Sequence, residues 1–213
     1  KIVVRNEKLK MEESAMEDFI SLIRKRRTIR QFQPREVPLK LLYQLVDLGR
    51  LAPSASNLQP LEFLVVSDDQ VKRQVFSCLR WAAYINPAGD PQPGQEPAAY
   101  IIILVNTQIR NKGFEYDVGA AAENIILGAL SAGVGSCWLI SVDRERLQPA
   151  LRLPDSHQID SVIALGYPAE QPVVEEFSGS VKYWKDEKGC LHVPKRNLKE
   201  VAHWNFYGQK LPL

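Results

Sequence analysis

The chain has 213 residues, of which 45% are hydrophobic and 24% are charged, and its formal net charge at pH 7 is +2. This length and composition predict a single soluble domain over residues 1–213, which can bury about 70% of its extended surface in one core. So small a net charge argues against a nucleic-acid-binding protein, which usually has a broad basic face. No run approaches the roughly 18 apolar residues of a membrane span, and the N-terminus is too polar for a signal peptide, so we expect a cytoplasmic protein without a membrane partner.

The three cysteines, Cys78, Cys137 and Cys190, are far apart and lack C-x-x-C spacing. Their odd number and wide separation predict reduced thiols rather than a disulfide framework. This spacing does not indicate a zinc or iron–sulfur site, so the sequence predicts no metal centre.

The first predicted helix begins at a capping box formed by Ser14 and Glu17 and ends at five cations within residues 24–30. Guanidinium groups packed this closely repel one another, and a phosphate that accepts paired hydrogen bonds from them would relieve the repulsion. A solvated basic helix end is the alternative, because cations also complement the negative end of a helix dipole. The cluster is therefore a candidate anion site.

A second helix is predicted after Pro38, with Gly49 weakening it and Pro53 blocking its continuation. The small polar segment 53–60 then predicts a loop that leads into a strand over 62–66. Such residues form ordinary turns, and they also let a ligand approach the backbone closely.

A third helix is predicted from Asp68 or Asp69, either of which can act as its N-cap. The proline-rich stretch 81–98 follows and is predicted to be irregular, either a lid over a site or a variable connection. The apolar run 99–105 is rich in Ile and Val, which is typical of a strand buried on both faces.

A long helix over 116–132 is rich in Gly and Ala, so its backbone should approach a neighbour closely, and Gly133 is well placed to end it. A strand over 134–140, a short helix over 143–151 and a strand over 160–165 follow. Strands that alternate with helices favour a layered α/β domain with a parallel sheet.

The last part of the chain predicts a hairpin over residues 182–193, followed by the basic pair Lys195 and Arg196. The aromatic tail 201–207 belongs to a predicted C-terminal arm over 198–213. A terminus this apolar is expected to dock on a protein surface.

Four motifs occur in a fixed order along the chain. They are Arg26-Arg27-Thr28-Ile29-Arg30, Pro53-Ser54-Ala55-Ser56-Asn57-x-Gln59-Pro60, Gly133-x-Gly135-Ser136-x-Trp138 and Ala164-Leu165-Gly166-Tyr167-Pro168. In this order and spacing the chain resembles the nitroreductase family of FMN-dependent oxidoreductases, over about residues 17–207.

The resemblance implies an α+β nitroreductase-like sandwich, in which a mostly antiparallel sheet is flanked by helices, and this replaces the parallel sheet expected above. It also implies an intertwined homodimer with FMN at the interface. The cofactor-binding residues implied by position are Arg26, Arg27, Thr28, Arg30, Pro53, Ser54, Ala55, Ser56, Asn57, Gln59, Trp138, Leu139, Ile140, Ser141, Lys195 and Arg196.

Within this set, residues 26–30 would hold the phosphate, ribityl chain and pyrimidine edge, and Arg196 with Lys195 would close on the phosphate. Residues 53–57 would reach the flavin from the other subunit. A backbone N–H near Ile140 would point at the flavin N5, where donors stabilise the anionic reduced flavin without an acid or base. The resemblance therefore implies no catalytic side chain.

Two positions depart from the family pattern: Leu61 stands where many members have Trp, and Ser141 stands where many have Gly. We therefore expect the flavin edge and the substrate face to differ in shape.

The function implied by the resemblance is ping-pong transfer of hydride from NADH or NADPH to a nitroaromatic, a quinone or a similar acceptor. One alternative keeps the fold and is a flavin-consuming or reductively dehalogenating enzyme. The others are a flavin-binding protein without turnover and a basic module that binds nucleic acid through residues 24–30.

Overall fold

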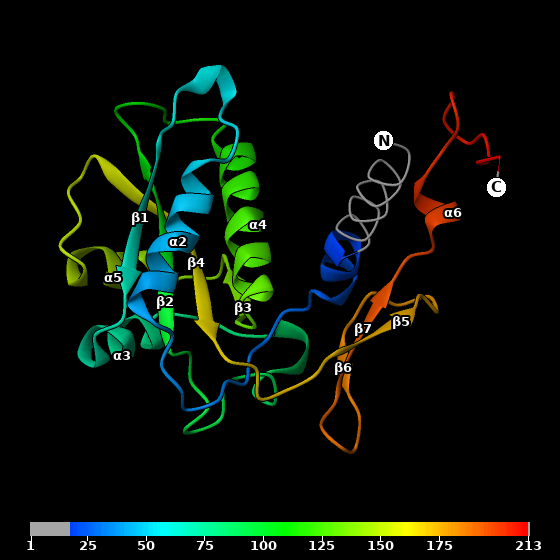
Figure 1. The fold of residues 1–213 in the computed structure, drawn as a ribbon, viewed down its shortest axis with the longest axis horizontal. Helices are drawn as coiled ribbons and strands as arrows, with labels where there is room; N and C mark the ends of the chain where they lie inside the picture. Colours follow the sequence, from blue (N-terminus) through cyan, green and yellow to red (C-terminus); the bar gives the residue numbers. More distant parts are fainter. Residues whose placement is uncertain (1–17, 213) are drawn as a thin grey trace, which may run out of the picture.

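The computed structural model describes residues 18–212. Its centre is a four-stranded sheet (Figure 1). The strands, in spatial order, are β1 (Leu61–Val66), β2 (Ala99–Asn106), β4 (His157–Gly166) and β3 (Gly135–Leu139). Every neighbouring pair is antiparallel, which confirms the antiparallel sheet implied by the family resemblance.

The parallel sheet expected from the alternation of helices and strands is wrong. That expectation followed from the alternation of strands with helices, and an apolar run buried on both faces, such as that of β2, is also common in parallel sheets. Here helices cover both faces of an antiparallel sheet, so the same apolar run appears without parallel pairing. Burial on two faces does not determine strand direction.

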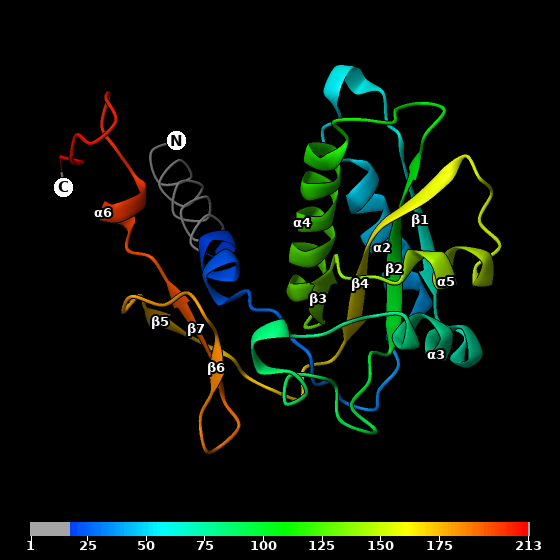
Figure 2. The ribbon, with the colours of Figure 1, turned by 180° about the vertical axis from the view of Figure 1, so that it is seen from behind.

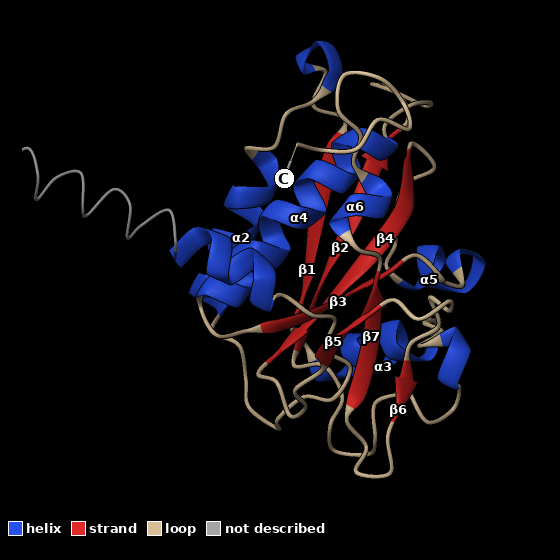
Figure 3. Ribbon diagram, turned by 90° about the vertical axis from the view of Figure 1, so that its right-hand side faces the viewer, coloured by secondary structure: helices blue, strands red, loops and turns tan. Residues whose placement is uncertain are grey.

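Alternate residues of β2 enter two separate cores, as the two-residue period of a strand requires. Tyr100 and Ile102 pack on one face, and Ile101 and Ile103 on the other. The first face is covered by α3 (Asp69–Ser77) and α5 (Arg144–Ala150), and the second by α2 (Leu39–Arg50) and α4 (Glu115–Ser131). The three layers are visible in Figure 3.

The helix boundaries agree closely with the expected ones. Asp68 caps α3 by accepting from the backbone N–H groups of Gln70 and Val71, and Gly133 ends α4 with a φ of +74°. A helix also covers residues 18–25 and stops at the basic cluster. Its predicted capping box lies outside the described residues.

Close packing of α2 on α4 depends on two glycines. A Cβ on Gly128 would lie 2.4 Å from Leu48 Cδ1, and one on Gly49 would lie 2.8 Å from Ile125 Cδ1. The close approach expected for the Gly- and Ala-rich helix is confirmed. Gly49 lies inside α2, where it makes room for Ile125.

A second, smaller sheet follows β4 and stands apart from the main sheet, as Figures 1 and 2 show. It contains β5 (Val173–Glu176), β6 (Trp184–Lys185) and β7 (Leu191–Lys195), in the order β5-β7-β6. β6 and β7 pair antiparallel, which confirms the predicted hairpin. The short helix α6 (Leu198–Val201) follows β7.

The stretch 81–98 contains only the short 3₁₀ helix η2 (Ala83–Ile85). The side chain of Gln31 fixes the middle of this stretch. Its amide nitrogen donates to Asp90 O at 2.9 Å, and its amide oxygen accepts from Gln92 N at 2.9 Å. Across residues 18–212, no helix is both long and apolar enough to cross a bilayer.

Candidate functional site

The basic cluster continues from the first helix into an extended segment that lies beside β3. Arg26 N donates to Leu22 O at 3.0 Å in the last helical turn. Ile29 N then donates to Ser136 O at 2.9 Å, and Thr28 forms a parallel bridge with Ser136. The structure therefore brings two of the four sequence motifs, the basic cluster and the Gly-x-Gly-Ser segment, into direct contact.

Two cavities open along this pair of segments. The first, called the basic cavity, has a volume of about 570 Å³, and its lining includes Lys25, Arg26 and Arg27. The second, called the strand-end cavity, has a volume of about 690 Å³ and is lined by Arg30 and by residues 137–141, among others.

Positive charge is concentrated at the basic cavity. Arg26 Nε lies 3.7 Å from Glu123 Oε1, and Arg27 donates to the backbone oxygen of Arg26. Burial and the neighbouring Arg26 charge both lower the pKa of the Arg27 guanidinium, which means that its charged form is disfavoured where it lies. A bound anion would offset that cost.

Arg30 has an unused hydrogen-bond donor. Its Nε is buried and has no partner among the described residues, while its guanidinium carbon lies 5.1 Å from the centre of the Tyr183 ring. Its backbone N–H and that of Gln31 both donate to the Glu170 carboxylate. An acceptor bound in the strand-end cavity would satisfy a buried donor that otherwise costs about 1–3 kcal/mol.

The thiol that lines the strand-end cavity is a poor nucleophile. Burial raises the pKa of Cys137 to about 11, so this thiol is neutral near pH 7. Trp138 Nε1 donates to Ser161 Oγ at 2.8 Å, which fixes the indole, and 36% of the Trp138 side-chain surface stays exposed. These groups suit the binding of a flat, uncharged ring better than covalent catalysis.

Arg144 holds the backbone that follows β3. Its guanidinium donates to Ile140 O at 3.2 Å and to Ile159 O at 2.8 Å, and it also donates to Asp160 O. The turn after Leu139 is thereby tied to β4. Ile140 and Ser141, both predicted site residues, lie in this fixed turn.

The loop over residues 53–59 lies at the N-terminal end of α4, whereas the basic cavity lies near its C-terminal end, as Figure 2 shows for the loop. Asp117, in the first turn of α4, accepts from Ser54 Oγ at 2.8 Å and from Ala55 N at 3.2 Å. Leu130, near the last turn, lines the basic cavity. Leu130 comes thirteen positions after Asp117 in the same helix, which corresponds to about 20 Å at 1.5 Å per residue. One chain therefore does not bring this loop to the basic cluster.

Lys195 and Arg196 line neither cavity. Arg196 instead turns toward α6, where its Nη2 donates to Glu200 O at 3.1 Å. Their predicted closure on the phosphate therefore has no counterpart within a single chain.

Sequence analysis missed three residues that position the site: Asp117, Arg144 and Glu170. Each acts on backbone groups of distant segments, and local sequence patterns do not show such pairings.

Comparison with known proteins places the chain among its relatives. The sequence profile of the Nitroreductase family matches residues 23–167. A protein of Methanothermobacter thermautotrophicus, provisionally named NADH dehydrogenase/NAD(P)H nitroreductase, is 32% identical over 73% of this chain and 80% of its own length. An iodotyrosine deiodinase of Haliscomenobacter hydrossis is 27% identical over 71% of this chain and 79% of its own.

Among solved structures, a nitroreductase-like protein of Desulfovibrio desulfuricans, crystallised in complex with FMN, superimposes with a TM-score of 0.65. The match covers 89% of this chain and 97% of that one at 23% sequence identity, which establishes a common fold. With the family profile covering more than half of the sequence, this chain belongs to the nitroreductase family.

Proposed function

We propose that the protein is an FMN-dependent oxidoreductase that transfers hydride from NADH or NADPH to an oxidised organic acceptor, a nitroaromatic or a quinone. The observation that carries the proposal is the buried Nε of Arg30 beside the strand-end cavity, which has no partner among residues 18–212, in a chain of the nitroreductase family. The neighbouring basic cavity offers the donors that a phosphate requires.

The residues present fit FMN. Arg26, Arg27 and Thr28 would hold its phosphate and ribityl chain, and Arg30 its pyrimidine edge. The end of β3 and the two residues after it, residues 138–141, would lie against the isoalloxazine ring. When bound, FMN supplies the hydride exchange between the two substrates.

The protein contributes position and polarity to this chemistry rather than an acid or a base. Ile140 follows the last ladder residue of β3, so its backbone is available to the site, and Arg144 keeps that backbone in place. The neutral Cys137 adds no competing nucleophile beside the ring. A preorganised donor of this kind stabilises developing negative charge without needing to move.

A second copy of the chain would complete the site. Residues 53–57, and also Lys195 and Arg196, lie away from the basic cluster in one chain, so they reach a flavin only across an interface. The aromatic tail supports this arrangement, because the described side chains of Trp204, Phe206 and Tyr207 are 46%, 77% and 94% exposed. A large apolar surface left uncovered on one chain is typical of an interface.

Truncation after Leu198 should therefore yield a protein that is largely monomeric and poor in flavin. The deletion removes the aromatic tail, whose side chains are exposed among the described residues, so the fold of the monomer should survive. Light scattering would give the mass, and absorbance would give the flavin content. A truncated dimer with full flavin content would contradict the proposed interface.

The proposed activity has a direct test. Protein purified without added cofactor should be yellow, and the flavin released by heat should run as FMN on chromatography. Anaerobic mixing with NADH or NADPH should bleach it, and a nitroaromatic or a quinone should restore the colour. Colourless protein that binds no added FMN would overturn the proposal, and flavin that no nicotinamide bleaches would indicate a passive carrier.

Reductive dehalogenation is a second candidate, favoured by the similarity to an iodotyrosine deiodinase over 71% of this chain. That reaction consumes two electrons and a proton. The carbon–halogen bond breaks, a carbon–hydrogen bond forms, and the halogen leaves as halide. The acceptor panel should therefore include a halogenated phenol, with halide release as the measurement. We expect the acceptor to be selected by the segment that contributes Ala82, Ala83 and Asn86 to the lining of the strand-end cavity.

A further inference from the structure

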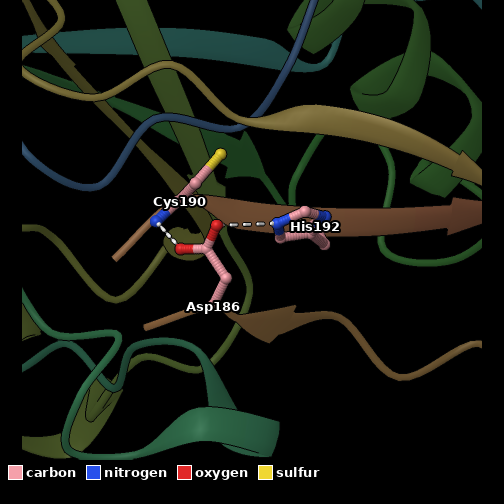
Figure 4. Close-up of side chains that lie close together, drawn as sticks. All are labelled: Asp186, Cys190 and His192. Atoms are coloured by element: carbon pink, nitrogen blue, oxygen red, sulfur yellow. Dashed lines mark hydrogen bonds and ion pairs between the residues drawn. The ribbon is translucent and has the colours of Figure 1, made fainter. Parts of the chain in front are cut away.

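A group of metal-binding side chains lies in the small sheet. Asp186, Cys190 and His192 offer ligand atoms that all lie within 4.8 Å of one another (Figure 4), and none of these residues lines either cavity. We propose that this group binds a Zn²⁺ ion, with a water molecule in the fourth position.

The hairpin turn holds two of the ligands in place. Asp186 Oδ1 accepts from Lys188 N at 3.0 Å and from Cys190 N at 2.8 Å, and Asp186 N donates back to Cys190 O at 3.0 Å. One carboxylate oxygen thus fixes the turn while Oδ2 faces His192. The carboxylate and the start of β7 are prearranged, so little ordering is needed to bind a metal.

His192 presents its second nitrogen to the group. Its Nδ1 lies 2.5 Å from Glu175 Oε1, and Glu175 Oε2 accepts from Trp184 Nε1 at 3.3 Å. A carboxylate on Nδ1 fixes the imidazole tautomer in which Nε2 carries a lone pair, as in many zinc sites. Within the described part of the chain, Nε2 is buried and has no hydrogen-bond partner.

The distance between the His192 and Asp186 ligand atoms already matches a tetrahedral zinc site, and the Cys190 thiol has to turn toward them. With Zn–ligand bonds of about 2.0–2.3 Å, neighbouring ligand atoms lie about 3.3–3.8 Å apart. His192 Nε2 and Asp186 Oδ2 are 3.4 Å apart, close enough for an ion pair, although their geometry does not form a hydrogen bond. A small rotation of the Cys190 side chain, whose thiol now donates to Gln171 O at 3.6 Å, would complete the triangle.

The donor set favours zinc over the harder ions. A thiolate, an imidazole and a carboxylate together suit Zn²⁺, whereas Mg²⁺ and Ca²⁺ select oxygen ligands. Binding would release the Cys190 thiol proton to solvent, and His192 would contribute a lone pair, so the charges balance without another reactant. The ion would link β7 to the turn after β6 and, through Glu175, to β5.

A metal-free alternative exists, and it does not involve Cys190. Burial lowers the pKa of His192, but the hydrogen bond to Glu175 and the negative charges of Glu175 and Asp186 outweigh that effect and raise the pKa above the ordinary value. A protonated imidazole would then simply pair with two carboxylates. The zinc site requires the Cys190 sulfur and the metal-free arrangement does not, so experiments on Cys190 distinguish the two.

The experiment uses the full chain, stripped with a chelator and titrated with Zn²⁺ or Co²⁺. We expect one ion per chain and a thiolate-to-cobalt charge-transfer band. Cys190→Ser should abolish that band and weaken Zn²⁺ binding by at least about 100-fold, and Glu175→Gln should weaken it by about 10- to 100-fold. His203→Gln, which removes an exposed imidazole outside the group, should leave both readouts unchanged.

Alkylation of the wild-type chain gives a result that does not depend on whether a variant folds. Cys190 is half-buried, whereas Cys78 and Cys137 are buried, so Zn²⁺ should slow alkylation at Cys190 selectively, by about tenfold or more. Absence of the cobalt band, binding that survives Cys190→Ser, or equal alkylation with and without Zn²⁺ would each overturn the proposal.

Discussion

Asp117→Ala should lower the free energy of unfolding by about 3–5 kcal/mol, because it leaves a set of donors without their buried acceptor. The Asp117 carboxylate is 4% exposed and accepts from Ser54 Oγ, from Ala55 N and from Arg110 Nη1 at 3.3 Å. Removal of the carboxylate would leave the Arg110 guanidinium without this partner, and it would also release the loop over residues 53–59.

Denaturant unfolding of the flavin-free protein measures this loss. Asp47→Ala is the matched control, since Asp47 forms an exposed ion pair with Arg50, and such pairs contribute about 0–1 kcal/mol. The same Asp117 variant should bind FMN more weakly, because the released loop is proposed to complete the partner's site. Equal stability of the two variants would show that Asp117 does not hold the loop.

Arg26→Ala should weaken FMN binding by about one to two powers of ten, because a charged hydrogen bond contributes roughly 1.5–3 kcal/mol. Hydride transfer at saturating FMN should change much less. The phosphate end of FMN lies far from the atom that exchanges hydride, so the lost contact is shared by the ground state and the transition state.

Titration of FMN into the flavin-free variant, followed by stopped-flow reduction at saturation, separates the two effects. Arg24→Ala is the matched control, since it removes the same charge from an exposed helical position that does not line the basic cavity. If affinity is unchanged while saturated hydride transfer collapses, Arg26 lies at the other end of the cofactor. Equal loss of affinity in both variants would indicate a general charge effect instead.

Local chemistry made much of the chain predictable. Asp68 and Gly133 begin and end helices through contacts with residues a few positions away, so their sequence context determines their role. The expected strand over 99–105 matches β2, and the expected hairpin matches β6 with β7, because β-branched runs and Gly turns act over short distances. The basic cluster likewise follows directly from the sequence.

The sequence by itself determined the place of most helices and of the strands of the main sheet, which stretch carries the excess positive charge, and which family the motif order resembles. Only the tertiary structure decided the antiparallel direction of the strands, because burial on two faces is compatible with either direction. It also decided that Arg30 Nε is buried without a partner among the described residues, that Asp117 holds the loop at residues 53–59, and that Glu170 accepts from the backbone of Arg30 and Gln31. These pairings join residues through folding of the backbone, and hydrogen-bond geometry over such separations leaves no trace in local sequence patterns.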